Sequence, residues 1–229
     1  MLLLRNLIYW LILVVSLIAM FPFILLAAVV PNGAHTVARQ WVKILMWSLK
    51  NIVGLKYRLV GAENIPDKPS MQKIFPPQVF VAKRELFKIP FFGWGLKIVK
   101  TIGIERGSAQ ANAQLAKQGR ERRDEGYWIT IFPEGTRVAP GSKGRYKSGA
   151  ARMAKLFEMD IVPVALNSGE FWPKDSFLKY PGTVDVIIGP VIRHEDGSEA
   201  ELTARCEEWI ETQQQHINGK GPRAVANRH

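Results

Sequence analysis

Residues 127–137 read Tyr-Trp-Ile-Thr-Ile-Phe-Pro-Glu-Gly-Thr-Arg, an apolar run followed by a short turn. The apolar run is β-prone and predicts a buried strand. In the turn, Gly135 lets backbone N–H groups approach an anion, and the planar guanidinium of Arg137 can grip two phosphate oxygens. We expect Glu134 to hold either that arginine or a neighbouring loop in place. The stretch therefore predicts a phosphate-binding turn at the end of a strand.

Strands alternate with helices on both sides of this stretch, which predicts an α/β layer fold. Periodicity predicts strands at 55–60, 78–82, 102–104, 127–132, 161–166 and 183–188. It predicts helices at 90–100, 108–125 (with Ser108 as N-cap), 148–159 and 198–216. We expect residues 54–217 to form this domain and residues 218–229 to form a basic, frayed tail.

Residues 7–30 carry no charged side chain, and Ser16 is the polar side chain expected to be exposed. At about 1.5 Å per residue, the stretch is long enough to cross roughly 30 Å of hydrocarbon, and Pro22 is expected to kink it. A cleaved signal peptide is the competing interpretation. The run is long for one, and no clear cleavage site follows it. We interpret the stretch as a membrane anchor.

Residues 36–53 predict a second, amphipathic helix in which Trp41 lies opposite Arg39 and Lys43. Tryptophan with basic residues suits a helix that lies on lipid, and packing into the domain core is the alternative. Residues 1–53 are thus expected to form one membrane helix or a two-helix membrane motif. Basic residues follow the apolar run more than they precede it, which places the domain on the cytoplasmic face. For a bacterial protein the membrane would be the inner membrane.

The chain has 229 residues and a formal net charge of +11, which favours anionic partners. Nucleic acid is disfavoured, because no aromatic platform interleaves with a basic stripe and no nucleic-acid motif is present. The basic segment 141–147 directly follows the phosphate turn and is expected to extend that anion site. Cys206 is the only cysteine, so a disulfide within the chain is excluded. No metal site and no cofactor are predicted.

Further segments stand in order around the turn: residues 81–86 (Val-Ala-Lys-Arg-Glu-Leu), 89–93 (Ile-Pro-Phe-Phe-Gly), 103–106 (Gly-Ile-Glu-Arg) and 161–165 (Ile-Val-Pro-Val-Ala). With residues 132–137, they make the chain resemble the glycerolipid acyltransferases, specifically the 1-acyl-sn-glycerol-3-phosphate acyltransferases, over residues 54–190. The resemblance implies a mixed, mostly parallel sheet flanked by helices. It also implies acyl transfer from acyl-CoA or acyl carrier protein to the sn-2 hydroxyl of lysophosphatidic acid. The product is phosphatidic acid in phospholipid synthesis, formed beside anionic membrane lipids.

The resemblance also implies which residues bind the substrate phosphate: Glu134, Gly135, Thr136 and Arg137, together with Arg106. Two arginines at strand ends suit a dianion, although Arg106 can also be read as a surface cation. Lys83 ends a predicted strand and is a further candidate, with a solvated pair to Glu85 as its alternative. An apolar patch nearby is expected to contact the bilayer or an acyl chain, or else to pack in the core: Phe87, Ile89, Phe91, Phe92 and Trp94.

A general base is the part of the family pattern that this chain lacks. The resemblance implies a histidine with a carboxylate five positions on, which takes the proton of the attacking hydroxyl. It belongs between the first globular strand and residues 81–86, but residues 64–77 contain no histidine. About ten to fifteen residues, a strand and a helical turn, are missing near Ser70 or Met71. No catalytic residue is predicted, so we expect an impaired or inactive enzyme, or a non-catalytic lysophospholipid-binding homologue.

The other histidines are poor substitutes for this base. His194 has Glu199 five positions on, but it follows the phosphate turn in the chain and is expected to lie in an exposed loop. His35 has no carboxylate at that spacing. His216 and His229 lie at the end of the last predicted helix and in the tail.

Overall fold

The structure is a computed structural model of residues 1–229, and it describes all of them except 31, 67–77, 106–110, 175 and 225–229. The chain divides into two compact units. Unit 1 contains residues 1–9, 49–67 and 132–229, and unit 2 contains residues 10–48 and 68–131. The expected segment missing near Ser70 lies outside the described residues.

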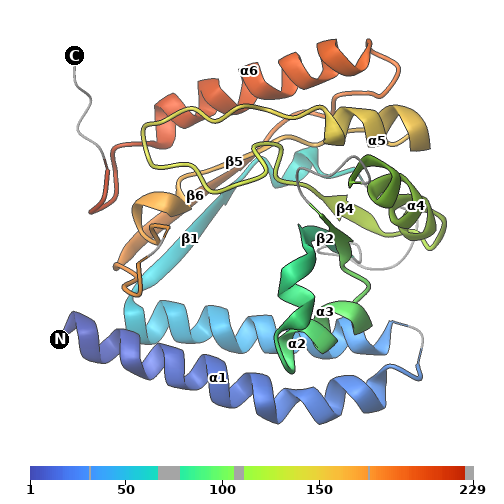
Figure 1. Cartoon of the computed structure of the whole chain (residues 1–229). Helices are drawn as coiled ribbons and strands as arrows, with labels where there is room; N and C mark the ends of the chain where they lie inside the picture. Colours follow the sequence, from blue (N-terminus) through green and yellow to red (C-terminus); the bar gives the residue numbers. More distant parts are fainter. Residues whose placement is uncertain (31, 67–77, 106–110, 175, 225–229) are drawn as a thin grey trace. The chain divides into compact units, whose positions relative to one another are not determined.

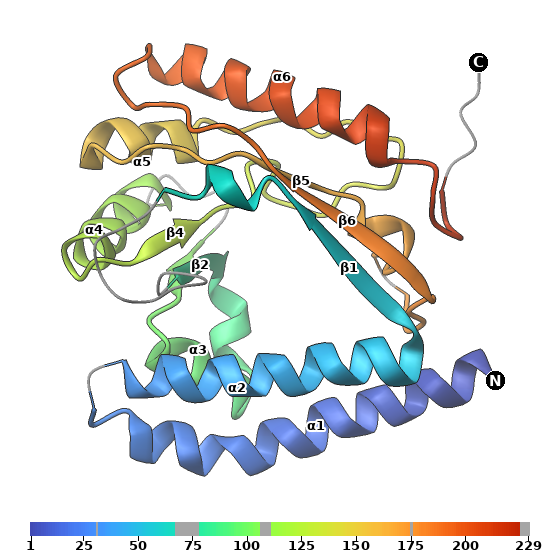
Figure 2. The same cartoon turned by 180° about the vertical axis from the view of Figure 1, so that it is seen from behind.

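Unit 1 is built on a mixed three-stranded sheet in the order β1-β6-β5 (Figures 1 and 2). Strand β1 (Leu55–Val60) runs parallel to β6 (Gly182–Ile188), with Leu55 opposite Gly182. Strand β5 (Val164–Leu166) runs antiparallel to β6. The segment that carries the predicted phosphate turn belongs to the same unit.

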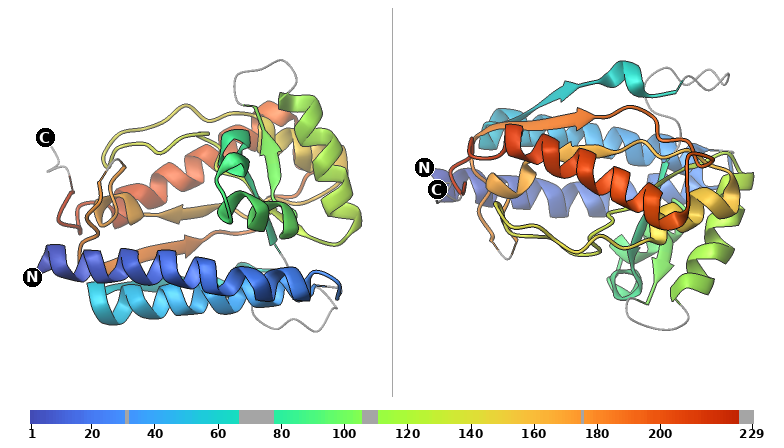
Figure 3. Two further views of the ribbon diagram at one scale, coloured as in Figure 1. Left: turned by 60° about the horizontal axis from the view of Figure 1, so that its bottom comes forward. Right: turned by 90° about the horizontal axis from the view of Figure 1, so that it is seen from above.

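Helix α6 (Glu199–Ile217) packs on β5 of this sheet, and α5 (Gly149–Phe157) packs against α6, as Figures 1 and 3 show. Helix α6 begins with a capping box, in which Ser198 Oγ accepts from the Glu201 N–H at 3.3 Å and Glu201 Oε2 accepts from the Ser198 N–H at 2.7 Å. Apolar side chains of both helices, of β5 and of the segment after β6 form the core: Ala151, Ala165, Ile192, Leu202, Cys206 and Ile210.

Unit 2 contains a parallel three-stranded sheet in the order β3-β2-β4. The strands are β2 (Gln78–Lys83), β3 (Ile102–Ile104) and β4 (Trp128–Thr130). Helix α4 (Ala111–Asp124) packs on this sheet, and the Gln118 amide exchanges two hydrogen bonds of 3.1 and 3.0 Å with the Gly103 backbone. The short helix α3 (Phe92–Ile98) precedes β3.

Helix α1 (Leu2–Ala27) is long and apolar enough to cross a membrane, and most of its apolar side chains are exposed. Helix α2 (Gly33–Ser48) runs back beside it and continues into a π-helical turn at Leu49–Val53 (Figures 1–3). Trp41 Nε1 donates to Ser16 Oγ at 3.0 Å. The one polar side chain expected to be exposed in α1 is therefore used to hold α2.

The prediction of an α/β fold with helices flanking β-structure is confirmed, but one mostly parallel sheet is not. The described strands form two separate sheets, and only the sheet of unit 2 is wholly parallel. The predicted strand at 127–132 is shorter because the Tyr127 N–H bonds back to Arg122 at the end of α4. The strand predicted at 161–166 starts only at Val164, because Pro163 has no N–H to give to a ladder. The predicted cap Ser108 lies outside the described residues.

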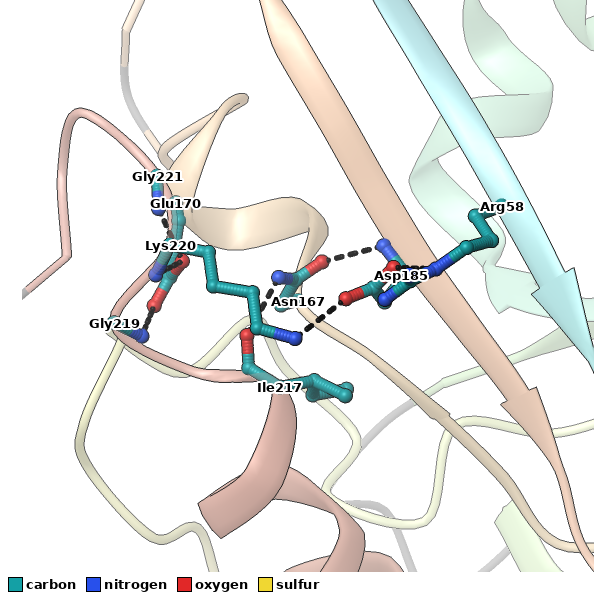
Figure 4. A network of polar contacts seen from close by, with 8 residues as sticks. All are labelled: Arg58, Asn167, Glu170, Asp185, Ile217, Gly219, Lys220 and Gly221. Atoms are coloured by element: carbon teal, nitrogen blue, oxygen red, sulfur yellow. Dashed lines mark hydrogen bonds and ion pairs between the residues drawn. The ribbon is translucent and has the colours of Figure 1, made fainter.

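Residues 219–221 are held to unit 1 rather than frayed (Figure 4). The Glu170 carboxylate is buried, and it accepts from the backbone N–H groups of Gly219, Lys220 and Gly221 at 2.6, 3.1 and 2.8 Å. A buried charge needs such partners to offset its lost hydration. The prediction of a frayed segment is therefore wrong for these three residues.

A second buried carboxylate ties the same segment to the sheet (Figure 4). Asp185 on β6 accepts from Arg58 Nε at 2.8 Å and from Lys220 Nζ at 2.9 Å. Burial opposes ionisation of Asp185, but these two hydrogen bonds outweigh it and hold its pKa below the usual value.

Candidate phosphate-binding site

The predicted phosphate turn, residues 132–137, lies in unit 1 and is closed by a hydrogen bond from the Gly135 N–H to the Phe132 carbonyl at 3.0 Å. Gly135 has a φ of +67°, which is in the left-handed region that favours glycine. Thr136 and Arg137 are exposed. The turn therefore presents a hydroxyl and a guanidinium to solvent from a backbone conformation that needs a glycine.

The side chain of Glu134 is directed at the segment that returns after the turn. A β-carbon placed on Gly144 would lie 2.6 Å from Glu134 Oε2, so a larger residue there would displace the carboxylate. Burial, together with the nearby Glu211 carboxylate, raises the pKa of Glu134. Glu134 was expected to hold either Arg137 or a neighbouring loop, and the structure shows it against the loop that contains Gly144.

Lys147 ends that returning segment and lies against the turn. Its backbone N–H donates to the Pro133 carbonyl at 3.0 Å. Its side chain lies along Gly135, where a β-carbon would be 3.0 Å from Lys147 Nζ. The sequence pointed only to a basic segment at 141–147, and the contact with Gly135 singles out Lys147 within it.

Lys179 is a buried cation that the sequence analysis missed. Its Nζ lies 4.8 Å from the ring centre of Tyr9 and 4.4 Å from that of Trp172. Asn6 holds the Lys179 backbone by donating to its carbonyl at 3.0 Å and accepting from its N–H at 2.7 Å. Burial, followed by the positive charge of Arg137, lowers the pKa of Lys179 to about 8.

The structure brings four of the predicted site residues together in the turn: Glu134, Gly135, Thr136 and Arg137. Lys83 ends β2 in unit 2 and pairs with Glu85 at 3.0 Å, the contact that the alternative interpretation expected. Hydrogen bonding to its own backbone and to Lys83 lowers the pKa of Glu85. Arg106 lies outside the described residues. A substrate role for Lys83 and Arg106 stays a prediction.

His194 is held by a carboxylate other than the one suggested by spacing. Its Nδ1 lies 2.9 Å from Asp160 Oδ1, and its backbone N–H donates to the same oxygen at 3.0 Å. Partial burial opposes ionisation of Asp160, but the bonds from His194 hold its pKa below the usual value. Glu199 instead pairs with Arg152 at 3.1 Å. The backbone contact suits a residue that fixes a local turn, whereas the ring contact is also the pairing that a general base would have.

The predicted aromatic patch is partly exposed. Ile89, Phe91 and Trp94 are exposed, while Phe87 and Phe92 are half-buried. The Phe21 ring of α1 lies 5.4 Å from Phe91 and 5.5 Å from Trp94, in edge-on and tilted arrangements. Core packing therefore does not account for the three exposed members, and the patch is continuous with the apolar helix α1.

An acyltransferase family model matches residues 64–167. A protein from Pseudomonas aeruginosa named 1-acyl-sn-glycerol-3-phosphate acyltransferase is 38% identical over 193 residues, covering 76% of this chain and 75% of that protein. The chain belongs to the 1-acyl-sn-glycerol-3-phosphate acyltransferase family. A family member from Borreliella burgdorferi is 30% identical over 171 residues, 67% of each chain. The membership confirms the resemblance drawn from the sequence segments.

The fold of this acyltransferase family member is also similar to a solved structure. The crystal structure of the 1-acyl-sn-glycerophosphate (LPA) acyltransferase PlsC from Thermotoga maritima matches with a TM-score of 0.71. The match covers 94% of this chain and 95% of that chain at 20% sequence identity, and at this identity it shows the fold alone.

Proposed function

We propose that this chain binds lysophosphatidic acid through residues 132–137. The reaction class is acyl transfer from acyl-CoA or acyl carrier protein to the sn-2 hydroxyl, which gives phosphatidic acid. Family membership carries this proposal, because a relative with that named activity is 38% identical over 193 residues. The geometry of the turn supports it, since Arg137 is exposed and Gly135 adopts the left-handed backbone that the turn needs.

In this proposal the substrate phosphate lies against the turn, with the Arg137 guanidinium gripping two of its oxygens. The Thr136 hydroxyl is a further donor. Glu134 positions the turn through its contact with Gly144 rather than by touching the phosphate. Lys83 and Arg106 add positive charge when substrate is bound.

Deprotonation of the sn-2 hydroxyl is the step for which this chain lacks a predicted residue. A positioned general base contributes about 10²–10⁴-fold to rate, and residues 64–77 carry no histidine to supply one. We therefore propose turnover slower than that of family members by a factor of this size. A non-catalytic lysophospholipid-binding protein is the alternative, and the same absence favours it.

We further propose that α1 and the patch around Trp94 bring the chain to a membrane containing anionic lipid, with the domain on the cytoplasmic face. The exposed apolar side chains of α1 support this placement. So do the net charge of +11 and the basic residues Arg39, Lys43 and Lys50 that follow α1.

Two measurements on the full chain in mixed micelles test the proposal. The first is binding of lysophosphatidic acid against lysophosphatidylcholine of the same chain length. Arg137→Ala should weaken binding of the phosphate monoester about 10- to 100-fold. The control Arg205→Ala removes the same charge from an arginine paired with Asp196 at 3.1 Å, and it should have no effect. Equal affinity of the wild type for both lysolipids would refute the phosphate site.

The second measurement is acyl transfer from acyl carrier protein and from acyl-CoA. Slow turnover with tight substrate binding supports the impaired enzyme. Binding with no turnover from either donor selects the non-catalytic homologue. Turnover at the rate of a family member that has the histidine would overturn the proposed impairment.

A further inference from the structure

The returning segment after the phosphate turn carries two lysines, and their surroundings differ. Lys143 Nζ lies 2.6 Å from Glu207 Oε1 on α6, and this hydrogen bond raises the pKa of Lys143. Lys147 forms no ion pair with a carboxylate in the part of the chain that the structure describes, and neither does Arg137. Of these two lysines, Lys147 is the one whose charge is not already compensated by a carboxylate.

The position of Lys147 is set by the turn itself. Its backbone is joined to Pro133, two residues before Gly135, by the 3.0 Å hydrogen bond. Its Nζ, Cε and Cδ atoms would lie 3.0, 3.3 and 3.5 Å from a β-carbon on Gly135, so the aliphatic stem runs along the glycine. The side chain is exposed, so its ammonium is open to a ligand on this face of the turn. Gly135 therefore provides both the left-handed backbone and the surface on which the lysine lies.

We propose that Lys147 is a phosphate-binding residue and that it makes the site selective for a phosphate monoester over a phosphodiester. A monoester dianion has three terminal oxygens. The Arg137 fork takes two of them in one plane, and the third is left for a point charge such as the Lys147 ammonium. A phosphodiester carries a single charge and only two terminal oxygens, so it gains less from Lys147. This inference rests on the proposed function and assigns a residue and a specificity to the same site.

The test compares lysophosphatidic acid with lysophosphatidylglycerol of the same acyl chain, an anionic phosphodiester, in neutral detergent micelles. Lys147→Met should weaken binding of lysophosphatidic acid about 10- to 100-fold, because a hydrogen bond to a charged group is lost. Binding of lysophosphatidylglycerol should change about threefold or less, so the preference for the monoester should fall. Lys147→Arg keeps the charge and should recover part of the preference.

Lys143→Met is the matched control, since it removes the same charge four residues away from a lysine already paired with Glu207. It should leave both affinities unchanged. The Lys147 side chain is exposed, and thermal denaturation of each variant checks that the fold is kept. A fall in both affinities by the same factor for Lys147→Met would show general charge attraction and overturn the selectivity.

The outcomes separate this inference from the proposed function. Wild-type affinity in Lys147→Met, together with lost affinity in Arg137→Ala, would overturn the Lys147 assignment and leave the phosphate turn intact. Equal binding of both lysolipids by the wild type, with no effect of Arg137→Ala, would overturn the proposed function and the inference with it.

Discussion

Replacing Gly135 with alanine tests the turn most directly. Its φ of +67° costs an alanine about 1–2 kcal/mol, because a β-carbon crowds the neighbouring carbonyl in the left-handed region. Loss of chain entropy in the unfolded state offsets about 0.4–1 kcal/mol of this cost. The expected loss in unfolding free energy is therefore about 1 kcal/mol, which urea denaturation measures.

Gly126 offers a matched control for that strain. Its φ is +80°, and a β-carbon on it would meet nothing within 4 Å. Gly126→Ala should therefore lose about the same stability as Gly135→Ala. At Gly135 the new methyl would instead meet the end of Lys147, which is flexible and moves aside. That movement costs little stability, but it displaces the ammonium from the turn.

The two variants should therefore differ in ligand binding and not in stability. We expect Gly135→Ala to weaken lysophosphatidic acid binding at least about tenfold, through the displaced Lys147 and the methyl group added to the turn. Gly126→Ala should bind as the wild type does. Equal lysophosphatidic acid affinity in the two variants, at equal loss of stability, would refute the assignment of the turn as the phosphate site.

Further predictions concern groups outside the turn. Glu170→Gln should lower the unfolding free energy by about 2–4 kcal/mol, because three N–H groups lose an ionised acceptor; unchanged urea denaturation and unchanged trypsin cleavage near Lys220 would contradict this. The lowered pKa of Lys179, about 8 against the usual 10.5, means that the folded chain releases this proton first. Wild-type stability should thus gain from Lys179 as pH rises from about 8 to 10.5, and Lys179→Met should lack that gain in urea titrations across this range. His194→Ala should leave any residual acyl transfer unchanged, since His194 lies after β6, beyond the phosphate turn in the chain; abolished turnover would make the Asp160–His194 pair a catalytic candidate, because a carboxylate on Nδ1 is the arrangement of a general base. Serine at Leu11, Val15 and Ile18, exposed on α1, should reduce flotation with anionic liposomes, and undiminished flotation would count against α1 as the anchor.

Local features of the fold were predictable because they depend on neighbouring residues. The strand at 55–60 has the predicted bounds, as does the short strand at 102–104. The capping role of Ser198 depends on Glu201 three residues on, which is a local relation. The conformation of Gly135 follows from the same kind of information, since a glycine between polar residues after a strand indicates a turn.

Contacts between residues that are distant in the chain were decided only by the tertiary structure. Periodicity predicts that a segment is a strand but not which strand lies beside it. The sequence therefore could not show that the strands form two sheets rather than one. Glu170 reaches Gly219 across 49 residues, and that contact turned an expected tail into an ordered segment. A hydrogen bond or an apposed charge depends on where the chain returns in space, which local backbone preferences do not encode.

The candidate site divides in the same way. The sequence by itself determined the family, the glycine-bearing turn with its arginine, and the lack of a histidine in residues 64–77, because each is a property of short stretches and their order in the chain. Only the structure shows that Glu134 faces Gly144, that Lys147 lies on Gly135 and that Lys143 forms an ion pair with Glu207. Each of these depends on how the chain folds back after the turn, which the residues of the turn do not specify by themselves.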